Sequence, residues 1–171
     1  MYSTYPIHKS PIKLQRSIVV NSVNALKFVT MQIKNIPIDK VNEVAKGTLM
    51  EHLEIEVTEI GEDYIVAKMP VDRRTQQPLG MLHGGASVAL IESLGSIGSS
   101  LMVDMGKFFP VGLEVNANHV GTAKQGFVEA RGTVVHAGKR THVWKVDIRT
   151  MDTKRLVCTG RLTVMIVEKK D

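Results

Sequence analysis

The stretch of residues 80–103, GMLHGGASVALIESLGSIGSSLMV, constrains the fold of this chain more than any other part. After its glycine pair, the apolar residues leave no consistently polar face, which predicts a helix over residues 86–103 that is buried nearly all round. Glu92 is the only ionisable residue in that helix. Because a dehydrated carboxylate without a partner costs much free energy, we expect Glu92 either to be paired or to have a chemical task.

Helical spacing places small and polar side chains beside this glutamate. Ala89, Glu92, Ser96 and Ser99 share one face, so Ser96 can hydrogen-bond Glu92. The glycines before the helix leave backbone N–H groups open at its N-terminus, where an anion or a developing oxyanion could be held. The alternative is a close-packed core helix whose glutamate is satisfied by Ser96 alone, and the spacing does not decide between the two interpretations.

The length of 171 residues fits one domain, and the charge pattern bears on its partners. The net charge is +5, but the excess is confined to five cations that precede the first acidic residue, Asp39: Lys9, Lys13, Arg16, Lys27 and Lys34. The rest of the chain is neutral, which argues against nucleic acid as a partner.

The N-terminal 32 residues differ from the rest. We expect residues 1–32 to be a disordered extension and residues 33–171 to form the domain. Asparagines interrupt the apolar run SIVVNSVNALKFV, so a signal peptide is not expected. A transit peptide, or a true start at Met31, are the alternatives.

Cys158 is the only cysteine, so an intrachain disulfide and a cysteine-based zinc site are both excluded. Cys158 lies in a strand-like run of alternating polar and apolar residues, which predicts that it is a packing residue rather than a nucleophile. A reducing, cytoplasmic location is expected. We expect no transmembrane segment either, because Glu92, serines and glycines interrupt the run 86–103.

The remaining pattern predicts two strands, the helix and then four strands. A short amphipathic helix is expected over residues 37–49, with Gly47 near its end or interrupting it. Strands are expected at 53–60 and 64–69, and then at 111–120, 127–135, 142–150 and 156–167, with links short enough for antiparallel neighbours. An antiparallel sheet wrapped around one central helix gives an α+β class.

The segments QPLGMLHGGASVALIESLGS, VGLEVNANHV and HAGKRTHVW carry a resemblance to a known family. They resemble the hotdog-fold acyl-CoA thioesterases of the PaaI-like branch, including its 1,4-dihydroxy-2-naphthoyl-CoA thioesterases of menaquinone biosynthesis. The resemblance covers residues 33–167 and implies a hotdog fold, no cofactor and no metal.

The resemblance also implies roles for five residues. Glu92 is the expected nucleophile or general base, and the Gly84 backbone N–H is expected to polarise the thioester carbonyl. His83 is expected to shape the site, although it could instead be the base or a structural hydrogen-bond partner. Gln77 and Ser96 are expected near the reacting carbonyl or water. The chemistry suits these residue types, because a carboxylate attacks or activates water while N–H groups hold the oxyanion.

For the CoA moiety, the resemblance points to three places. These are Gly112; His119, Val120, Gly121 and Thr122; and His136, Ala137, Gly138, Lys139, Arg140 and Thr141. Lys139 and Arg140 form a cationic hairpin tip that could hold phosphates, although a solvated turn uses the same residues. The family carries an arginine where this chain has Gly121, so part of the phosphate contact is absent or shifted to the tip.

The expected function is hydrolysis of an aromatic acyl-CoA, 1,4-dihydroxy-2-naphthoyl-CoA or a benzoyl-CoA-like thioester, to free acid and CoA. One alternative is a non-catalytic acyl-CoA-binding or regulatory hotdog protein. A hotdog dehydratase is a third option, disfavoured because the helix lacks an Asp- or His-centred motif. The resemblance implies a homodimer that pairs into a dimer of dimers, with Glu92 of one chain facing the glycine turn of the other.

Overall fold

The computed structural model describes residues 32–34 and 36–170. The elements follow one another as α1 (Ile38–Glu43), α2 (Leu49–His52), β1 (Glu56–Ile60), β2 (Tyr64–Pro70), α3 (Gly84–Ser100), β3 (Phe108–His119), β4 (Phe127–Ala137), β5 (Thr141–Thr150) and β6 (Leu156–Glu168). The predicted order of two strands, one long helix and four strands is confirmed, and so is the α+β class. The expected extension, residues 1–32, lies outside the described residues except for Gln32, so it stays a prediction.

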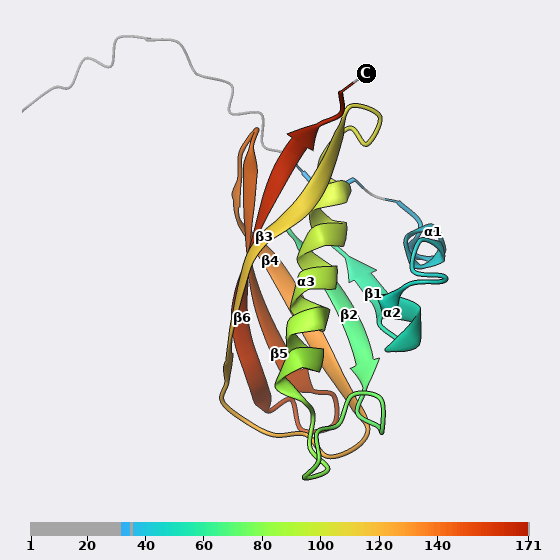
Figure 1. The fold of residues 1–171 in the computed structure, drawn as a ribbon, viewed down its shortest axis with the longest axis vertical. Helices are drawn as coiled ribbons and strands as arrows, with labels where there is room; N and C mark the ends of the chain where they lie inside the picture. The colour runs from blue at the N-terminus through green and yellow to red at the C-terminus, as the bar shows by residue number, and fades with distance from the viewer. Residues whose placement is uncertain (1–31, 35, 171) are drawn as a thin grey trace, which may run out of the picture.

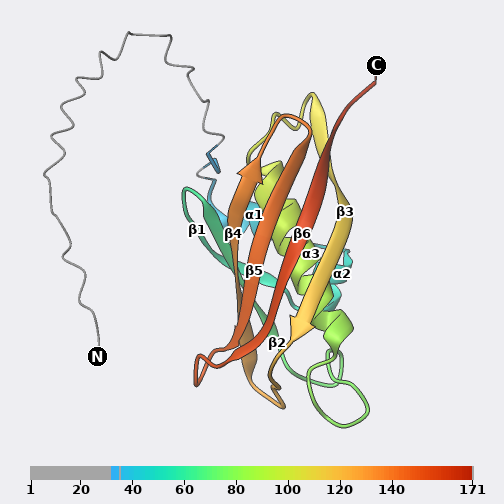
Figure 2. The ribbon, with the colours of Figure 1, turned by 90° about the vertical axis from the view of Figure 1, so that its left-hand side faces the viewer.

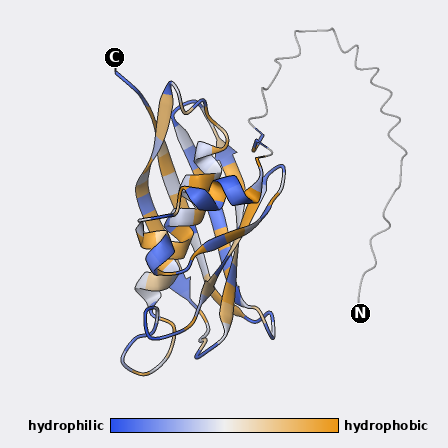
Figure 3. Cartoon of the chain, turned by 90° about the vertical axis from the view of Figure 1, so that its right-hand side faces the viewer, coloured by the Kyte–Doolittle hydropathy of each residue, from blue (hydrophilic) through white to orange (hydrophobic). Residues whose placement is uncertain are grey.

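The strands form one six-stranded sheet in the order β1-β2-β4-β5-β6-β3, with every neighbouring pair antiparallel. The sheet curves around α3, which crosses its concave face (Figure 1, Figure 2). Hydrophobic and hydrophilic residues alternate along the strands (Figure 3), as expected when only one face of a sheet is buried. This arrangement is the predicted hotdog architecture.

One pairing prediction was wrong. The short link after β3 suggested that β3 and β4 are neighbours, but β3 pairs with β6 at the sheet edge while β4 lies between β2 and β5. In the sheet, β3 and β4 are three strand spacings apart, which is only about 14 Å, and the seven residues after His119 can span that distance. A short link therefore does not require that the strands be adjacent.

The short N-terminal helix is also divided in two. Gly47 has a φ of +73° between α1 and α2, a conformation that side chains rarely adopt, so it interrupts the helix predicted over residues 37–49. Before α1, the buried Ile33 donates its N–H to the Glu62 carbonyl. The described fold thus begins at Ile33.

The long helix packs unusually close to the sheet. A Cβ on Gly98 would lie 2.5 Å from Trp144 Cη2, and one on Gly95 would lie 2.5 Å from Leu162 Cδ2. The indole Nε1–H of Trp144 donates to Ser99 Oγ at 2.9 Å, so both polar atoms are satisfied inside the core. Trp144 is therefore a core residue, and the glycines of α3 make room for its ring.

The prediction that the helix is buried all round holds for only one face in the single chain. Fully buried positions face the sheet, whereas Glu92, Ser93 and Ser96 are half-buried. The helix also ends at Ser100 and not at residue 103. One face of α3 is thus left accessible beside the edge strand β3.

Candidate active site

The Glu92 side chain leans from α3 onto the middle of β3. A Cβ built on Gly112 would lie 2.1 Å from Glu92 Oε1, so the carboxylate occupies the space that any side chain there would fill. The β3–β6 register shifts between Gly112 and Glu114, which marks an irregularity in the strand at this point. Gly112 thus creates the room in which the Glu92 carboxylate lies.

The carboxylate is held on one side only. Ser96 Oγ donates to Glu92 Oε1 at 3.1 Å, and no other hydrogen bond to this carboxylate is found within residues 32–34 and 36–170. The second oxygen, Oε2, can therefore act on a substrate or a water molecule. The predicted stripe of Ala89, Glu92 and Ser96 is present, but Ser99 is fully buried and bonds Trp144 instead.

The N-terminus of α3 is capped by a histidine. His83 Nδ1 accepts the Gly85 N–H at 2.8 Å, and the His83 carbonyl accepts the N–H groups of Ala86 and Ser87. The Gly84 N–H has no acceptor among the described residues. A free N–H at a helix start is the type of donor that an oxyanion requires.

Gly84 also lies against the end of β3. A Cβ on Gly84 would stand 2.8 Å from His119 Nε2, which places the His119 imidazole directly beside the start of the helix. His83, Gly84 and His119 therefore form one cluster. It contains both the predicted polarising group and one of the predicted CoA contacts.

Gln77 belongs to the loop that leads into the helix. Its Oε1 accepts the Leu79 N–H, and its carbonyl accepts the Gly80 N–H at 2.8 Å, so the side chain closes its own turn. The start of this loop is held by Arg74, whose guanidinium lowers the pKa of Asp72 to about 2. The Nε2 donor of Gln77 has no partner among the described residues and can serve a ligand.

Within one chain the two halves of the predicted site are separate. Gly84 and Glu92 are eight residues apart in α3, which corresponds to about 12 Å along the helix axis. A single thioester carbonyl cannot be held by the first and attacked by the second. The structure brings Glu92 together with Ser96 and Gly112, and Gly84 together with His83 and His119, but it does not join the two clusters.

The predicted CoA residues also fall at opposite ends of the sheet. Val120 and Gly121 donate their N–H groups to the Val157 carbonyl at 2.9 and 3.0 Å, beside the N-terminus of α3. Residues 136–141 form the β4–β5 hairpin at the other end, closed by a 2.9 Å bond from Gly138 N to the Thr141 carbonyl. Gly112 lies between them, near the middle of β3.

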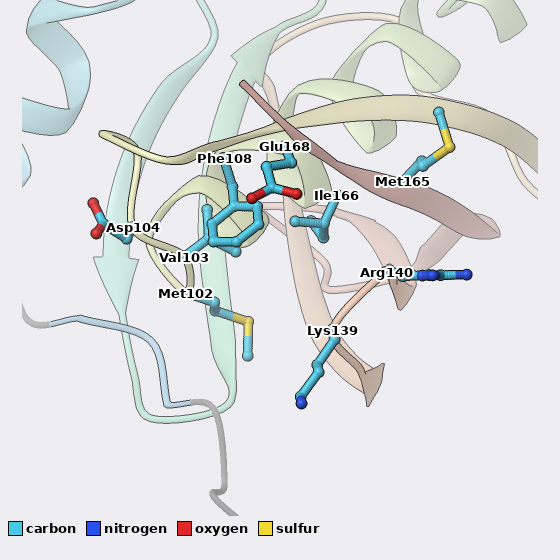
Figure 4. A pocket seen from close by; sticks show the side chains of 9 residues that line it. All are labelled: Met102, Val103, Asp104, Phe108, Lys139, Arg140, Met165, Ile166 and Glu168. Atoms are coloured by element: carbon cyan, nitrogen blue, oxygen red, sulfur yellow. The ribbon is translucent and has the colours of Figure 1, made fainter. Parts of the chain in front are cut away.

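The hairpin tip borders a cavity of about 690 Å³. Its floor is apolar, and its rim carries Lys139 and Arg140 together with two carboxylates (Figure 4). Its lining residues are Met102, Val103, Asp104, Phe108, Lys139, Arg140, Met165, Ile166 and Glu168. Lys139 and Arg140 were singled out from the sequence, whereas Met165, Ile166 and Glu168 lie outside the quoted motifs, so spacing gave no signal for these three.

Other features bear on the chemistry. Cys158 is fully buried, and burial raises the pKa of its thiol, which suits the predicted packing role. In the described part of the chain, no three His, Cys, Asp or Glu side chains cluster as metal ligands would. A helix of sufficient length and hydropathy to cross a membrane is likewise not found among the described residues.

Comparison with known proteins gives consistent matches. A family model described as the thioesterase superfamily matches residues 79–157. The 1,4-dihydroxy-2-naphthoyl-CoA hydrolase of Escherichia coli strain K12 is 44% identical over 78% of this chain and 97% of its own length. A mutant of thioesterase PA1618 from Pseudomonas aeruginosa superposes with a TM-score of 0.78 at 38% identity, covering 82% of this chain and 100% of that one. Thioesterase HI1161 from Haemophilus influenzae superposes with a TM-score of 0.76 at 42% identity, covering 81% of this chain and 95% of that one.

Proposed function

Because this chain belongs to the thioesterase superfamily and is a thioester hydrolase, we propose that it cleaves an aromatic acyl-CoA to the free acid and CoA. The proposed substrate is 1,4-dihydroxy-2-naphthoyl-CoA or a benzoyl-CoA-like thioester. The name of the Escherichia coli relative supports this substrate class. The observation that carries the proposal is the Glu92 carboxylate, held by Ser96 against the bare backbone of Gly112.

The proposed chemistry uses Glu92 and Gly84. The Gly84 N–H donates a hydrogen bond to the thioester oxygen as negative charge develops on it, while Ser96 fixes Oε1 and leaves Oε2 to react. In one route, Oε2 attacks the carbonyl carbon, the C–S bond breaks to release the CoA thiolate and leave an anhydride with Glu92, and water then hydrolyses the anhydride and supplies the proton that the thiolate takes up. In the other route, Oε2 takes a proton from water, the hydroxide attacks, and the CoA thiolate leaves with that proton.

Supporting roles follow from the loop and the helix cap. His83 caps α3 through Nδ1 and so fixes the position of the Gly84 N–H, and we assign it a positioning role. Gln77, with one carboxamide donor still available, is proposed to contact the carbonyl or the water. The remaining proposed CoA contacts are Gly112, residues 119–122 and residues 136–141.

We propose that two chains complete each site. The edge strand β3 exposes Phe109, Val111 and Leu113, and an unpaired edge of this kind favours strand pairing with another copy. Antiparallel pairing of two β3 strands would bring the His119 end of one chain to the Phe108 end of its partner. The Gly84 cluster of one chain would then approach the Glu92 cluster of the other.

The same pairing accounts for the two groups of CoA contacts. Residues 119–122 of one chain and residues 136–141 of the other would lie at the same end of the dimer. We further propose that dimers pair into tetramers and that the protein acts in the cytoplasm in menaquinone biosynthesis. Residues 33–171 are proposed to form the thioesterase domain, with its start supported by the buried Ile33.

The test is a kinetic screen of the full chain with naphthoyl, benzoyl and aliphatic CoA thioesters, following release of the free CoA thiol. We expect the highest kcat/KM for aromatic acyl groups. The matched variant is Glu92→Gln, which keeps the volume and removes the charge, and its kcat should fall roughly a thousandfold or more while CoA still binds. Binding without thiol release in the unmodified protein would favour the non-catalytic alternative.

A second measurement tests for the anhydride route. Several turnovers in ¹⁸O-labelled water would place label in the Glu92 carboxylate only when an anhydride forms and water attacks it at the Glu92 carbonyl carbon. Mass spectrometry of the peptide that contains Glu92 reads this directly. Label confined to the product acid would exclude an anhydride that water attacks on the Glu92 side, and it fits both the general-base route and an anhydride that water attacks at the substrate acyl carbon.

A further inference from the structure

Two loops lie side by side at the end of the molecule where α3 begins (Figure 1, Figure 2). One is the segment that follows β3, residues 120–126, and the other joins β5 to β6. Val120 and Gly121 of the first loop donate to the Val157 carbonyl, which lies at the start of β6 just after the second loop. A Cβ on Gly121 would lie 2.5 Å from the Leu156 carbonyl oxygen, so this position has no space for a side chain.

Arg155 supplies a cation beside this crowded position. Its Nη2 donates to the Thr122 carbonyl, and its backbone bonds Thr150 on both sides, through Thr150 N to the Arg155 carbonyl at 3.0 Å and through Arg155 N to Thr150 Oγ1 at 3.3 Å. The side chain is exposed, and no carboxylate lies within ion-pair distance of it in the described part of the chain. The Arg155 guanidinium is therefore fixed in position and has further N–H donors that none of the described residues accepts.

These loops enclose a depression of about 310 Å³. Arg155 and Lys124 both line it, together with the threonines of the two loops and one carboxylate, Asp152. Asp152 already accepts the N–H of Thr153 at 2.6 Å, which lowers its pKa and keeps it charged. The full lining is Thr122, Ala123, Lys124, Gln125, Thr150, Asp152, Thr153 and Arg155.

The chemistry of this depression fits a phosphate group. Arginine with spare donors, a lysine and hydroxyl groups are the partners that phosphate oxygens use in proteins. By contrast, the side chains of Lys139 and Arg140 point away from each other at the hairpin tip (Figure 4). His119, which lies beside Gly84, is only three positions before Thr122, a span of at most about 10 Å.

We propose that Arg155, with Lys124, binds a phosphate of the CoA nucleotide in this depression. This inference rests on the proposed function, because it assumes a CoA thioester with its carbonyl at Gly84. The pantetheine arm would run along residues 119–122 and bring the nucleotide to the Thr122 carbonyl, where Arg155 is held. Arg155 thus takes the place of a cation that the chain cannot carry at Gly121.

The test compares Arg155→Ala with a matched control, Arg149→Ala. Arg149 is also exposed and also donates to a backbone carbonyl, that of Lys154, but it does not line the depression. Arg155→Ala should raise KM for benzoyl-CoA about tenfold with little change in kcat, because one charge-assisted contact is lost. KM for benzoyl-pantetheine, which lacks the nucleotide, should not change, and neither should any constant of Arg149→Ala.

Equal KM values for Arg155→Ala and Arg149→Ala would overturn the proposal. So would an equal loss with both substrates, because Arg155 would then only support the residue 122 segment. Arg155→Lys, which keeps the charge, should give an intermediate KM and replaces the alanine variant if that does not fold. The Lys139→Ala/Arg140→Ala double variant, assayed in parallel, measures the hairpin tip independently.

Direct binding keeps this proposal distinct from the proposed function. Adenosine 3′,5′-bisphosphate, titrated calorimetrically into the full chain, should bind, and Arg155→Ala should weaken it about tenfold. If the unmodified protein releases no thiol but shows this pattern, the proposed function fails and the phosphate site stands. If thioesters are hydrolysed and the bisphosphate binds both forms equally, the phosphate site fails alone.

Discussion

Glu92 and Gly112 occupy complementary space: the carboxylate on α3 fills the volume that a side chain on β3 would take, with Oε1 2.1 Å from the position of a Gly112 Cβ. A carboxylate can lie this close to a strand only where the strand carries no side chain. Gly112 therefore sets where Glu92 can be, although the two residues belong to different elements.

Gly112→Ala should lower kcat by about tenfold to a hundredfold, because the new methyl group displaces the reacting carboxylate by an ångström or more. Activity should be measured with a CoA thioester, and the urea midpoint should confirm that the chain folds. The control is a double-mutant cycle with Glu92→Gln. If Gly112→Ala lowers the residual rate of Glu92→Gln by the same factor, then the effect of Gly112 on the rate does not depend on the Glu92 carboxylate.

Gly84→Pro should lower kcat about a hundredfold or more by deleting the proposed oxyanion donor. Proline is tolerated at the first position of a helix, and His83, with φ −72° and ψ 136°, already has the conformation that a following proline requires. Gly84→Ala is the matched control, since it crowds His119 in the same way but retains the N–H. Equal activity of the two variants would remove Gly84 from the mechanism.

Mixing Glu92→Gln chains with Gly84→Pro chains should restore activity if each site is shared by two chains. A mixed dimer then has one intact site, so random exchange should recover about a quarter of the unmodified activity. Subunit exchange is verified by native mass spectrometry of differently tagged chains. Mixed dimers that remain inactive would show that Glu92 and Gly84 do not meet across the interface.

Trp144→Phe should lower the free energy of unfolding by about 1–3 kcal/mol, because the Ser99 hydroxyl loses its buried donor at the indole. Ser99→Ala should cost a similar amount by leaving the indole N–H unpaired. The double variant should cost less than the sum, since the two residues satisfy each other. Urea unfolding measures all three, and simple additivity would mean that this hydrogen bond contributes little.

The stability should fall on acidification because of His142. Its side chain is fully buried, neither ring nitrogen has a partner among the described residues, and burial together with the nearby His136 lowers its pKa. Below the unfolded pKa of about 6.5, the unfolded chain binds a proton that the folded chain resists, so the free energy of unfolding decreases as the pH falls. Urea unfolding between pH 8 and pH 5 should show a weaker pH dependence in His142→Leu, and an unchanged slope would exclude His142 as the cause.

Much of the fold follows from the sequence because it depends on local pattern. The alternation in residues 53–69 and 111–167 predicted six strands, and the apolar run after Gly84 predicted the long helix. Strand order was less accessible: the position of β3 next to β6 depends on which edges pair in space. A link of seven residues can join two neighbouring strands or two strands that are three positions apart in the sheet.

For the site, spacing within one helix gave the Ser96–Glu92 hydrogen bond, because residues four apart share a face. It could not show that Ser99 turns to Trp144, since that depends on a ring from a distant strand. Arg155 was also missed, because its contact with Thr122 joins two loops that are 33 residues apart in the chain. The roles of the site residues themselves remain predictions for the experiments above.

The contact of Trp144 with Gly95 and Gly98 also limits how the length of the chain can vary. Each inserted or deleted residue turns one part of a helix by about 100° relative to the other. An insertion between Glu92 and Gly95 would keep the tryptophan seated only by turning the glutamate away from Gly112. We therefore expect the spacing of three positions from Glu92 to Gly95 to be fixed, and insertions and deletions to be tolerated in the loop after α3.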